Sequence, residues 1–110
     1  MELNHFEIAA LEQFCTLTDV KVSYLRDLEI SNRDVTKAGF MTEFKENNLL
    51  CEKRVFDLIP DAVSLPSETN VGFLIYFEKG KLVALEGYVY GDEWPTKDNE
   101  LKFSDLPIKL

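Results

Sequence analysis

The chain has 110 residues, of which 45% are hydrophobic, so it is about the size of one domain and can bury a core without metal or disulfide staples. Twenty Asp and Glu residues against twelve Lys and Arg residues give a formal net charge of −8 at pH 7, and acidic residues outnumber basic ones in each third of the chain. Direct binding to nucleic acid is therefore not expected, because it normally requires a basic face.

A helix is predicted at the N-terminus. Asn4 is followed three residues later by Glu7, the pattern of a helix N-cap with its capping-box partner. We therefore predict a first helix from about Asn4 to Leu17. Its apolar side chains recur at helical spacing, at Leu3, Phe6, Ala10, Leu11, Phe14 and Leu17.

A second, shorter helical segment is expected next, capped by Thr18 or Asp19. One face of this segment would carry Tyr24, Leu25 and Leu28. After Ser31 the period changes to that of a strand, in which Phe40, Thr42 and Phe44 alternate with Met41 and Glu43. The polar run at 46–48 is typical of a turn.

The next strand is predicted from Lys53 to Ile59, where Pro60 stops it. A polar loop at 66–70 follows. Near the C-terminal end of the chain, residues 101–103 are expected to add a short edge strand to the sheet.

The stretch from Val71 to Pro95 predicts a hairpin followed by a loop. Two strands with period-2 alternation flank a two-residue turn at Lys79-Gly80. The sequence therefore predicts an α+β fold in one domain, residues 1–110, with an N-terminal helix or helices packed on an antiparallel sheet. One face of the hairpin is expected to carry Phe73, Ile75, Phe77, Val83, Leu85 and Val89.

Residue types that bind metals or act as nucleophiles are sparse. Cys15 and Cys51 lack CxxC spacing and His5 is the single histidine, so we predict no metal site and no Cys–His nucleophile. Both cysteines are interpreted as unpaired, buried apolar residues of a cytoplasmic protein, because no signal peptide is recognised. No phosphate-binding loop or nucleophile elbow occurs, and we expect no cofactor. The longest apolar runs fall far short of the roughly 20 residues that cross a bilayer, so no membrane association is expected.

The end of the hairpin is the candidate partner-binding site. Tyr and Trp are enriched in binding hot spots, while paired carboxylates can also serve acid/base chemistry or bind Mg²⁺. Two alternatives stay open: the carboxylates are ordinary solvated surface, and the tryptophan folds back as a lid on the core. The candidate residues are Glu86, Tyr88, Tyr90, Asp92, Glu93 and Trp94.

The segment Gly72–Pro95 reads GFLIYFEKGKLVALEGYVYGDEWP, and residues 37–44 read KAGFMTEF. These motifs, together with the helical N-terminus, resemble a family of small bacterial proteins with a GF strand, a G-K/R turn and an LEGYTYG(D/E)xWP ending, where this chain has Val89 in place of Thr. Some members of such families look like immunity proteins of contact-dependent growth inhibition systems. The resemblance implies a cytoplasmic partner of a toxin and assigns no interface residue.

Three functional hypotheses follow. The first is a protein-binding module, most concretely an immunity protein that neutralises a basic, nuclease-type toxin, because an acidic surface steers a basic partner. The second is a small enzyme or ligand-binding domain that uses acidic residues and tyrosines of the last hairpin around a pocket. The third is a homo-oligomer with the hairpin as its interface. Global acidity also commonly serves solubility alone.

Overall fold

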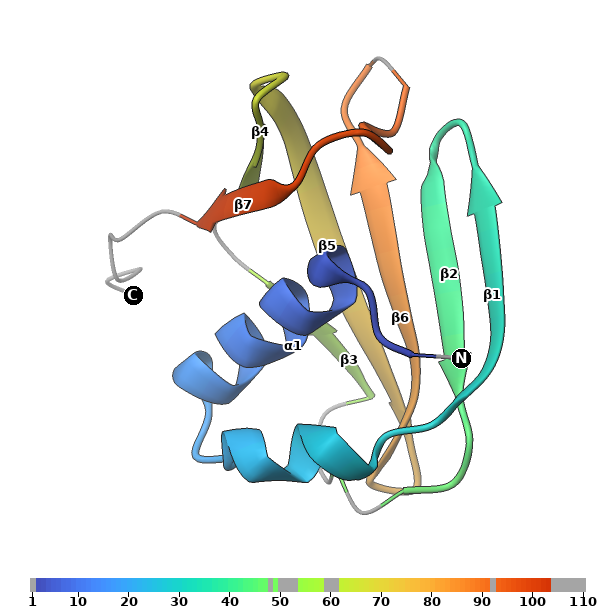
Figure 1. Ribbon diagram of the computed structural model, residues 1–110. Helices are drawn as coiled ribbons and strands as arrows, with labels where there is room; N and C mark the ends of the chain where they lie inside the picture. Colours follow the sequence, from blue (N-terminus) through green and yellow to red (C-terminus); the bar gives the residue numbers. More distant parts are fainter. Residues whose placement is uncertain (1, 48, 50–53, 59–61, 92, 104–110) are drawn as a thin grey trace.

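Figure 1 shows the computed structural model, which describes residues 2–47, 49, 54–58, 62–91 and 93–103. Its N-terminal helical segments pack on one face of an antiparallel sheet, so the predicted α+β fold is confirmed. The elements are α1 (His5–Leu17), the 3₁₀ helix η1 (Val22–Asp27), β1 (Ile30–Thr36), β2 (Gly39–Phe44), β3 (Val55–Asp57), β4 (Ala62–Leu65), β5 (Thr69–Glu78), β6 (Lys81–Val89) and β7 (Glu100–Phe103).

Helix α1 begins where the sequence predicts. The Asn4 side chain accepts a hydrogen bond from the Glu7 backbone N–H at 2.9 Å, and the Glu7 carboxylate accepts one from the Asn4 N–H at 2.8 Å, which completes the capping box. At the other end the Thr18 hydroxyl donates to the Phe14 carbonyl at 2.9 Å. The helix buries an apolar stripe consisting of Phe6, Ala10, Leu11, Phe14 and Cys15.

The second helical segment differs in kind from the prediction. Its N-cap is Lys21, without a side-chain hydrogen bond, because Thr18 is engaged by α1. A 3₁₀ helix has three residues per turn, so Leu25 and Leu28 share a side while Tyr24 does not. Accordingly, Leu25 is buried and Leu28 packs against the core, whereas Tyr24 is 47% exposed. The prediction of a shared face was wrong for Tyr24.

The sheet has seven strands, six of which lie in the order β1-β2-β6-β5-β4-β7. The seventh, β3, pairs with residues 74–76 of β5, just beyond the residues of β5 that pair with β4. Every pairing is antiparallel. The β5–β6 hairpin is confirmed at the centre of this sheet, with Lys79 and Gly80 at φ 52° and 82° in its turn. The predicted edge strand at 101–103 is confirmed as β7.

One register prediction in the hairpin was wrong. Tyr76 pairs with Ala84 and Phe77 with Leu82, so Val83 is an extra residue in β6 that interrupts the alternation. This bulge turns Leu82 toward the core, where it is 1% exposed, and leaves Val83 half-buried on the other side.

Two strands were not predicted. Edge strand β1 carries few apolar residues, because it has one strand neighbour and five of its seven side chains are exposed. Strand β4 has only four residues, too short for a clear alternation. The predicted strand at 53–59 corresponds to β3, and Lys53, Ile59 and Pro60 lie outside the described residues.

The core lies between α1 and the sheet. Val71, Phe73 and Ile75 of β5 are each 0% exposed. Aromatic rings from the helix and from the sheet meet there, with centroids 5.5 Å apart for Phe14 and Phe77. This side of the sheet is therefore the covered face, defined as the face under α1.

A buried carboxylate also ties α1 to the covered face. Glu7 is 0% exposed and accepts hydrogen bonds from Arg33 Nε (2.8 Å) and Nη2 (2.5 Å) and from the Thr42 hydroxyl. The hydrogen bonds from Arg33 raise the pKa of the guanidinium above its usual value. Glu7 thus caps the helix and neutralises an inward arginine of β1 at the same time.

Candidate functional site

The same strands present a second face that no described helix or strand covers. On β5, Leu74 and Tyr76 alternate with the fully buried Phe73 and Ile75 and are only half-buried. In Figure 1 both helices lie on the opposite side of these strands. We name this surface the open face, defined by the outward side chains Asp34, Met41, Glu43, Val55, Asp57, Leu74, Tyr76, Glu86, Tyr88 and Tyr90.

The register places acidic and apolar side chains alternately across five strands of the open face. Asp34 of β1 pairs with Met41 of β2, Met41 with Glu86 of β6, Glu86 with Leu74 of β5, and Leu74 with Asp57 of β3. Since neighbouring strands lie about 4.8 Å apart, successive carboxylates of this row stand roughly 10 Å apart. The open face therefore carries regularly spaced negative charge separated by apolar contacts.

Two tyrosines of the candidate site lie on the open face. Tyr88 is flanked in the register by Gly39 and Gly72, and a Cβ on Gly72 would come within 2.4 Å of the Tyr88 ring. The ring thus lies directly over the Gly72 backbone. Tyr90 is 54% exposed and its ring meets that of Tyr88 edge to face, with centroids 5.5 Å apart.

Glu86, the predicted acidic residue of the hairpin, also lies on the open face. Its Oε1 accepts a hydrogen bond of 2.6 Å from the Tyr76 hydroxyl. This bond, with smaller contributions from burial and from the Glu86 charge, raises the pKa of Tyr76 to about 12. A neutral donor thus orients the Glu86 carboxylate and leaves its charge uncompensated.

Basic residues are almost absent from these strands on the open side. Among the described residues at the outward positions of β1, β2, β3, β5 and β6, one is basic, namely Lys81 beside the hairpin turn. Its ammonium is 2.6 Å from Glu46 and is therefore already paired. The open face accordingly has a negative potential that its own bases do not cancel.

A hollow of about 230 Å³ lies on the open face between β1, β2 and β6. Gly39 lines it and approaches β6 so closely that a Cβ there would stand 1.9 Å from the Gly87 carbonyl oxygen. Asp34, at one side, accepts a hydrogen bond of 3.0 Å from the Asn32 amide. We call this the Gly39 hollow, whose outward lining is Asp34, Thr36, Gly39, Met41, Glu86 and Tyr88.

The loop after β6 turns away from the open face, so the structure divides the predicted site in two. Trp94 is 6% exposed, and the centroid of its ring lies 5.0 Å from the ring centroid of Phe6 and 5.2 Å from that of Phe40. It closes the core, as the lid interpretation predicted, and offers little contact area to a partner. Its backbone N–H donates to the Lys37 carbonyl at 2.7 Å and fixes the loop to the β1–β2 turn.

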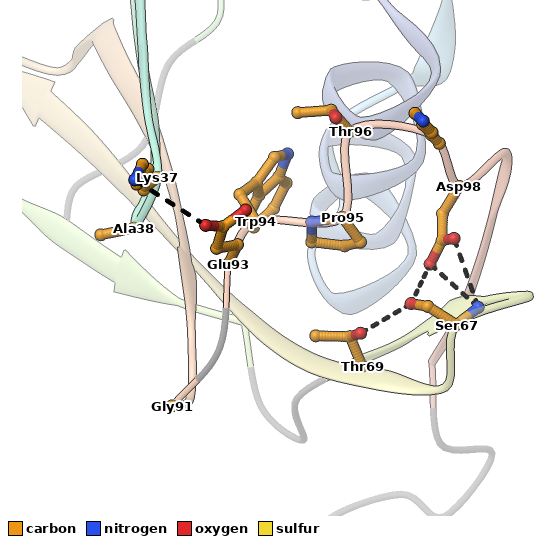
Figure 2. A pocket seen from close by; sticks show the side chains of 11 residues that line it. Lys37, Ala38, Ser67, Thr69, Gly91, Glu93, Trp94, Pro95, Thr96 and Asp98 are labelled. Atoms are coloured by element: carbon orange, nitrogen blue, oxygen red, sulfur yellow. Dashed lines mark hydrogen bonds and ion pairs between the residues drawn. The ribbon is translucent and has the colours of Figure 1, made fainter.

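Glu93 precedes this lid and is solvent-exposed, with its carboxylate 3.9 Å from the Lys37 ammonium (Figure 2). Asp92 lies outside the described residues. The structure therefore brings Glu86, Tyr88 and Tyr90 together on the open face and does not bring Glu93 or Trp94 to them.

A groove of about 820 Å³ lies beside this loop and is lined by neither Glu86 nor Tyr88. Figure 2 shows that Asp98 points within it toward Ser67, whose hydroxyl and backbone N–H both donate to the carboxylate. Ser64 donates a further hydrogen bond at 2.7 Å. Burial acts to raise the pKa of Asp98, but these hydrogen bonds outweigh it and lower that pKa. A carboxylate satisfied in this way ties the loop to β4 and is not poised as an acid or base.

Metal and thiol chemistry find no assembled site in the described part of the chain. No three His, Cys, Asp or Glu side chains gather there as a metal-binding set. Cys15 is buried and unpaired, as predicted, and burial together with the Glu12 charge raises the pKa of its thiol, which disfavours the reactive thiolate. Cys51 lies outside the described residues. None of the described helices combines the length and apolar character needed to cross a bilayer.

Sequence reasoning missed Asp34, Met41 and Tyr76 as members of the surface. Met41 and Tyr76 were visible as the outward positions of alternating strands, so the period-2 pattern signalled them. Asp34 carried no such signal, because its strand was not predicted.

The chain matches no protein-family model, no curated protein and no solved structure. The resemblance to the small bacterial family therefore stays a prediction from the motifs.

Proposed function

We propose that this chain is a cytosolic protein-binding module that binds a basic protein through the open face, most concretely an immunity protein that neutralises a nuclease-type toxin. The observation that carries the proposal is the uncovered row of alternating carboxylates and apolar side chains across five strands. Such a surface combines long-range attraction of a basic partner with apolar area for close contact.

The tyrosines support a contact role. Tyr88 lies on the central strand β6 and Tyr90 follows directly after its last residue, so the two present broad rings at little cost in conformational entropy. Clusters of this kind, fixed on a rigid scaffold, are typical of interface hot spots.

A toxin that acts on nucleic acid needs a basic face for its own substrate. An inhibitor with a net charge of −8 and a negatively charged contact face competes for that same face. Electrostatic steering would also accelerate capture, which matters for a toxin already in the cytosol.

The enzyme interpretation is less well supported. It requires acidic and tyrosine side chains of the hairpin around a pocket, whereas the hollow beside Glu86 and Tyr88 measures about 230 Å³, and a second hollow of about 370 Å³ beside Tyr76 is lined by neither Glu86 nor Tyr88. Small-molecule sites are usually about 300–1,000 Å³. A homo-oligomer built on the hairpin would also have to use the open face, because both edges of the hairpin are already paired within the sheet.

Co-expression tests the proposal. If a gene beside that of this chain encodes a large secreted protein, the C-terminal domain of that protein is expressed in a host with and without the chain. Survival that requires the chain, together with a complex of the two purified proteins, supports the immunity function. Toxicity that persists beside folded, abundant chain, or the absence of any such neighbouring gene, contradicts it.

A further inference from the structure

We propose that the open face takes an amphipathic helix of the basic partner, which crosses the strands and seats one large apolar side chain in the hollow beside Tyr76. The inference rests on the proposed function, because it names the element by which a basic partner would dock. It follows from the position of that hollow, from an apolar row of side chains that runs beside an acidic row, and from the spacing of the carboxylates.

The hollow of about 370 Å³ is a product of the strand register. Ala84 pairs with Tyr76 on one side and with Glu43 on the other, so a methyl group stands between two long side chains. The bulge in β6 places Val83 on the same side of the sheet. We call this depression the Ala84 hollow, which is lined by Met41, Glu43, Tyr76, Val83 and Ala84.

The lining of the Ala84 hollow suits an apolar side chain better than a small polar ligand. Glu43 supplies its charge, and the other lining residues are apolar apart from Tyr76. The Tyr76 hydroxyl is already engaged, because it donates to Glu86 at 2.6 Å. Small-molecule sites fix their ligand through several convergent polar groups, whereas an apolar anchor of a protein partner needs only a pocket that excludes water.

The hollow belongs to an apolar row that crosses the sheet. Tyr76 pairs with Val55 of β3, which is 47% exposed, and with Ala84 of β6. The next outward row along the strands, about 7 Å away, carries the carboxylates of Asp57 and Glu86. An apolar row beside an acidic row is complementary to a helix that has an apolar stripe and bases along one flank.

The spacing within the rows matches a helix that crosses the strands. Neighbouring strands lie about 4.8 Å apart and one helical turn rises about 5.4 Å, so successive turns lie over successive strands. Asp57 and Glu86 stand two strands apart, roughly 10 Å, and bases about seven residues apart on a helix are separated by about 10.5 Å. An extended segment of a partner would instead pair with a sheet edge, at β1 or β7.

Nuclear magnetic resonance of the ¹⁵N-labelled chain, titrated with two synthetic peptides, tests the inference without the partner. Both peptides have the same composition of leucine, lysine and alanine and contain about 15 residues, a length at which a helix spans roughly 22 Å. One carries its leucines at helical spacing, and the other alternates them in the period of a strand. We expect saturable shifts confined to the amides around Met41, Tyr76 and Ala84, with the helical peptide bound at least about tenfold more tightly.

Ala84→Leu fills the hollow without changing a charge and should weaken binding of the helical peptide about tenfold. Ala38→Leu is the matched control, because it makes the same substitution at an exposed alanine outside the Ala84 hollow, and it should leave binding unchanged. Val55→Ser removes an exposed apolar contact from the same row and should weaken binding in the same direction. It decides the question if Ala84→Leu does not fold.

Equal binding of the two peptides would overturn the inference, and so would shifts spread over exposed acidic residues in general. Full binding of the helical peptide by a folded Ala84→Leu chain, or by Val55→Ser where the first variant is unfolded, would also overturn it.

The two proposals fail separately. If the helical peptide binds at the Ala84 hollow but the chain neutralises no toxin in co-expression, the immunity function is wrong and the helix site stands. If the chain neutralises the toxin equally well with Ala84→Leu and Val55→Ser combined, the helix site is wrong and the function stands.

Discussion

The two faces of the central sheet are built from the same strands and differ in almost every physical property. On the covered face, alternate side chains of β5 are fully buried, aromatic rings meet at 5 to 6 Å, and the Glu7 charge is neutralised by Arg33. On the open face, the neighbouring positions are half-exposed and their carboxylates are oriented by neutral donors. The covered face thus holds the fold together, whereas no described helix or strand covers the open face.

The largest expected effect is a difference in stability between variants at two adjacent residues of β5, one on each face. Phe73→Ala should lower the free energy of unfolding by about 3–5 kcal/mol, because the ring is fully buried among other rings. Leu74→Ala, on the adjacent outward position, should cost about 1 kcal/mol. Urea unfolding followed by circular dichroism measures both. Equal losses would mean that the open face is also core.

The buried ion pair gives the next contrast. Arg33→Met keeps an apolar stem but leaves the Glu7 carboxylate buried without its cation, so we expect a loss of about 3 kcal/mol. Glu86→Gln on the open face should change stability by less than about 0.5 kcal/mol.

Adding Glu7→Gln to Arg33→Met serves as the check on the physical cause. The double variant no longer buries an unpaired charge and should recover part of the lost stability. If the double variant loses as much free energy of unfolding as Arg33→Met and Glu7→Gln lose separately in sum, the carboxylate and guanidinium are not coupled as described.

The smallest effect appears only at high pH. The folded-state pKa of Tyr76, about 12, lies above the unfolded value near 10, so the hydrogen bond to Glu86 contributes fully below about pH 10 and is lost as the pH rises through 12. Tyrosinate absorbance should show one late step that Tyr76→Phe removes. In Glu86→Gln that step should move toward pH 10, and a step that stays in place would contradict the assigned cause.

Much of the fold was predictable from local patterns. The Asn4–Glu7 capping box, the alternation in β5 and the Lys79-Gly80 turn each act through near neighbours in sequence, and all three were found. The Val83 bulge was missed because a bulge depends on pairing with another strand, which residue periodicity does not report.

The candidate site was predictable only in part, for a similar reason. Glu86, Tyr88 and Tyr90 follow from one strand, but the row that joins Asp34 to Glu86 depends on the order of the strands. The position of Trp94 depends on a hydrogen bond to Lys37, far away in sequence, so composition alone left its two interpretations open.

The most direct test of the contrast between the faces uses two double variants with the same net charge. Asp34→Lys with Glu86→Lys reverses two charges on the open face, and Glu12→Lys with Asp19→Lys reverses two exposed charges in the helical region. Each double variant raises the formal net charge by four, from −8 to −4. Stopped-flow association with the toxin domain identified by co-expression is measured for each at physiological salt, after thermal unfolding confirms that each is folded.

We predict that the open-face variant slows association at least about tenfold and weakens the complex, because both lysines oppose the basic partner within about a Debye length. The helical-region variant should slow association only slightly. Equal rates for the two variants would show that the acidity acts globally and that the open face is not the binding surface.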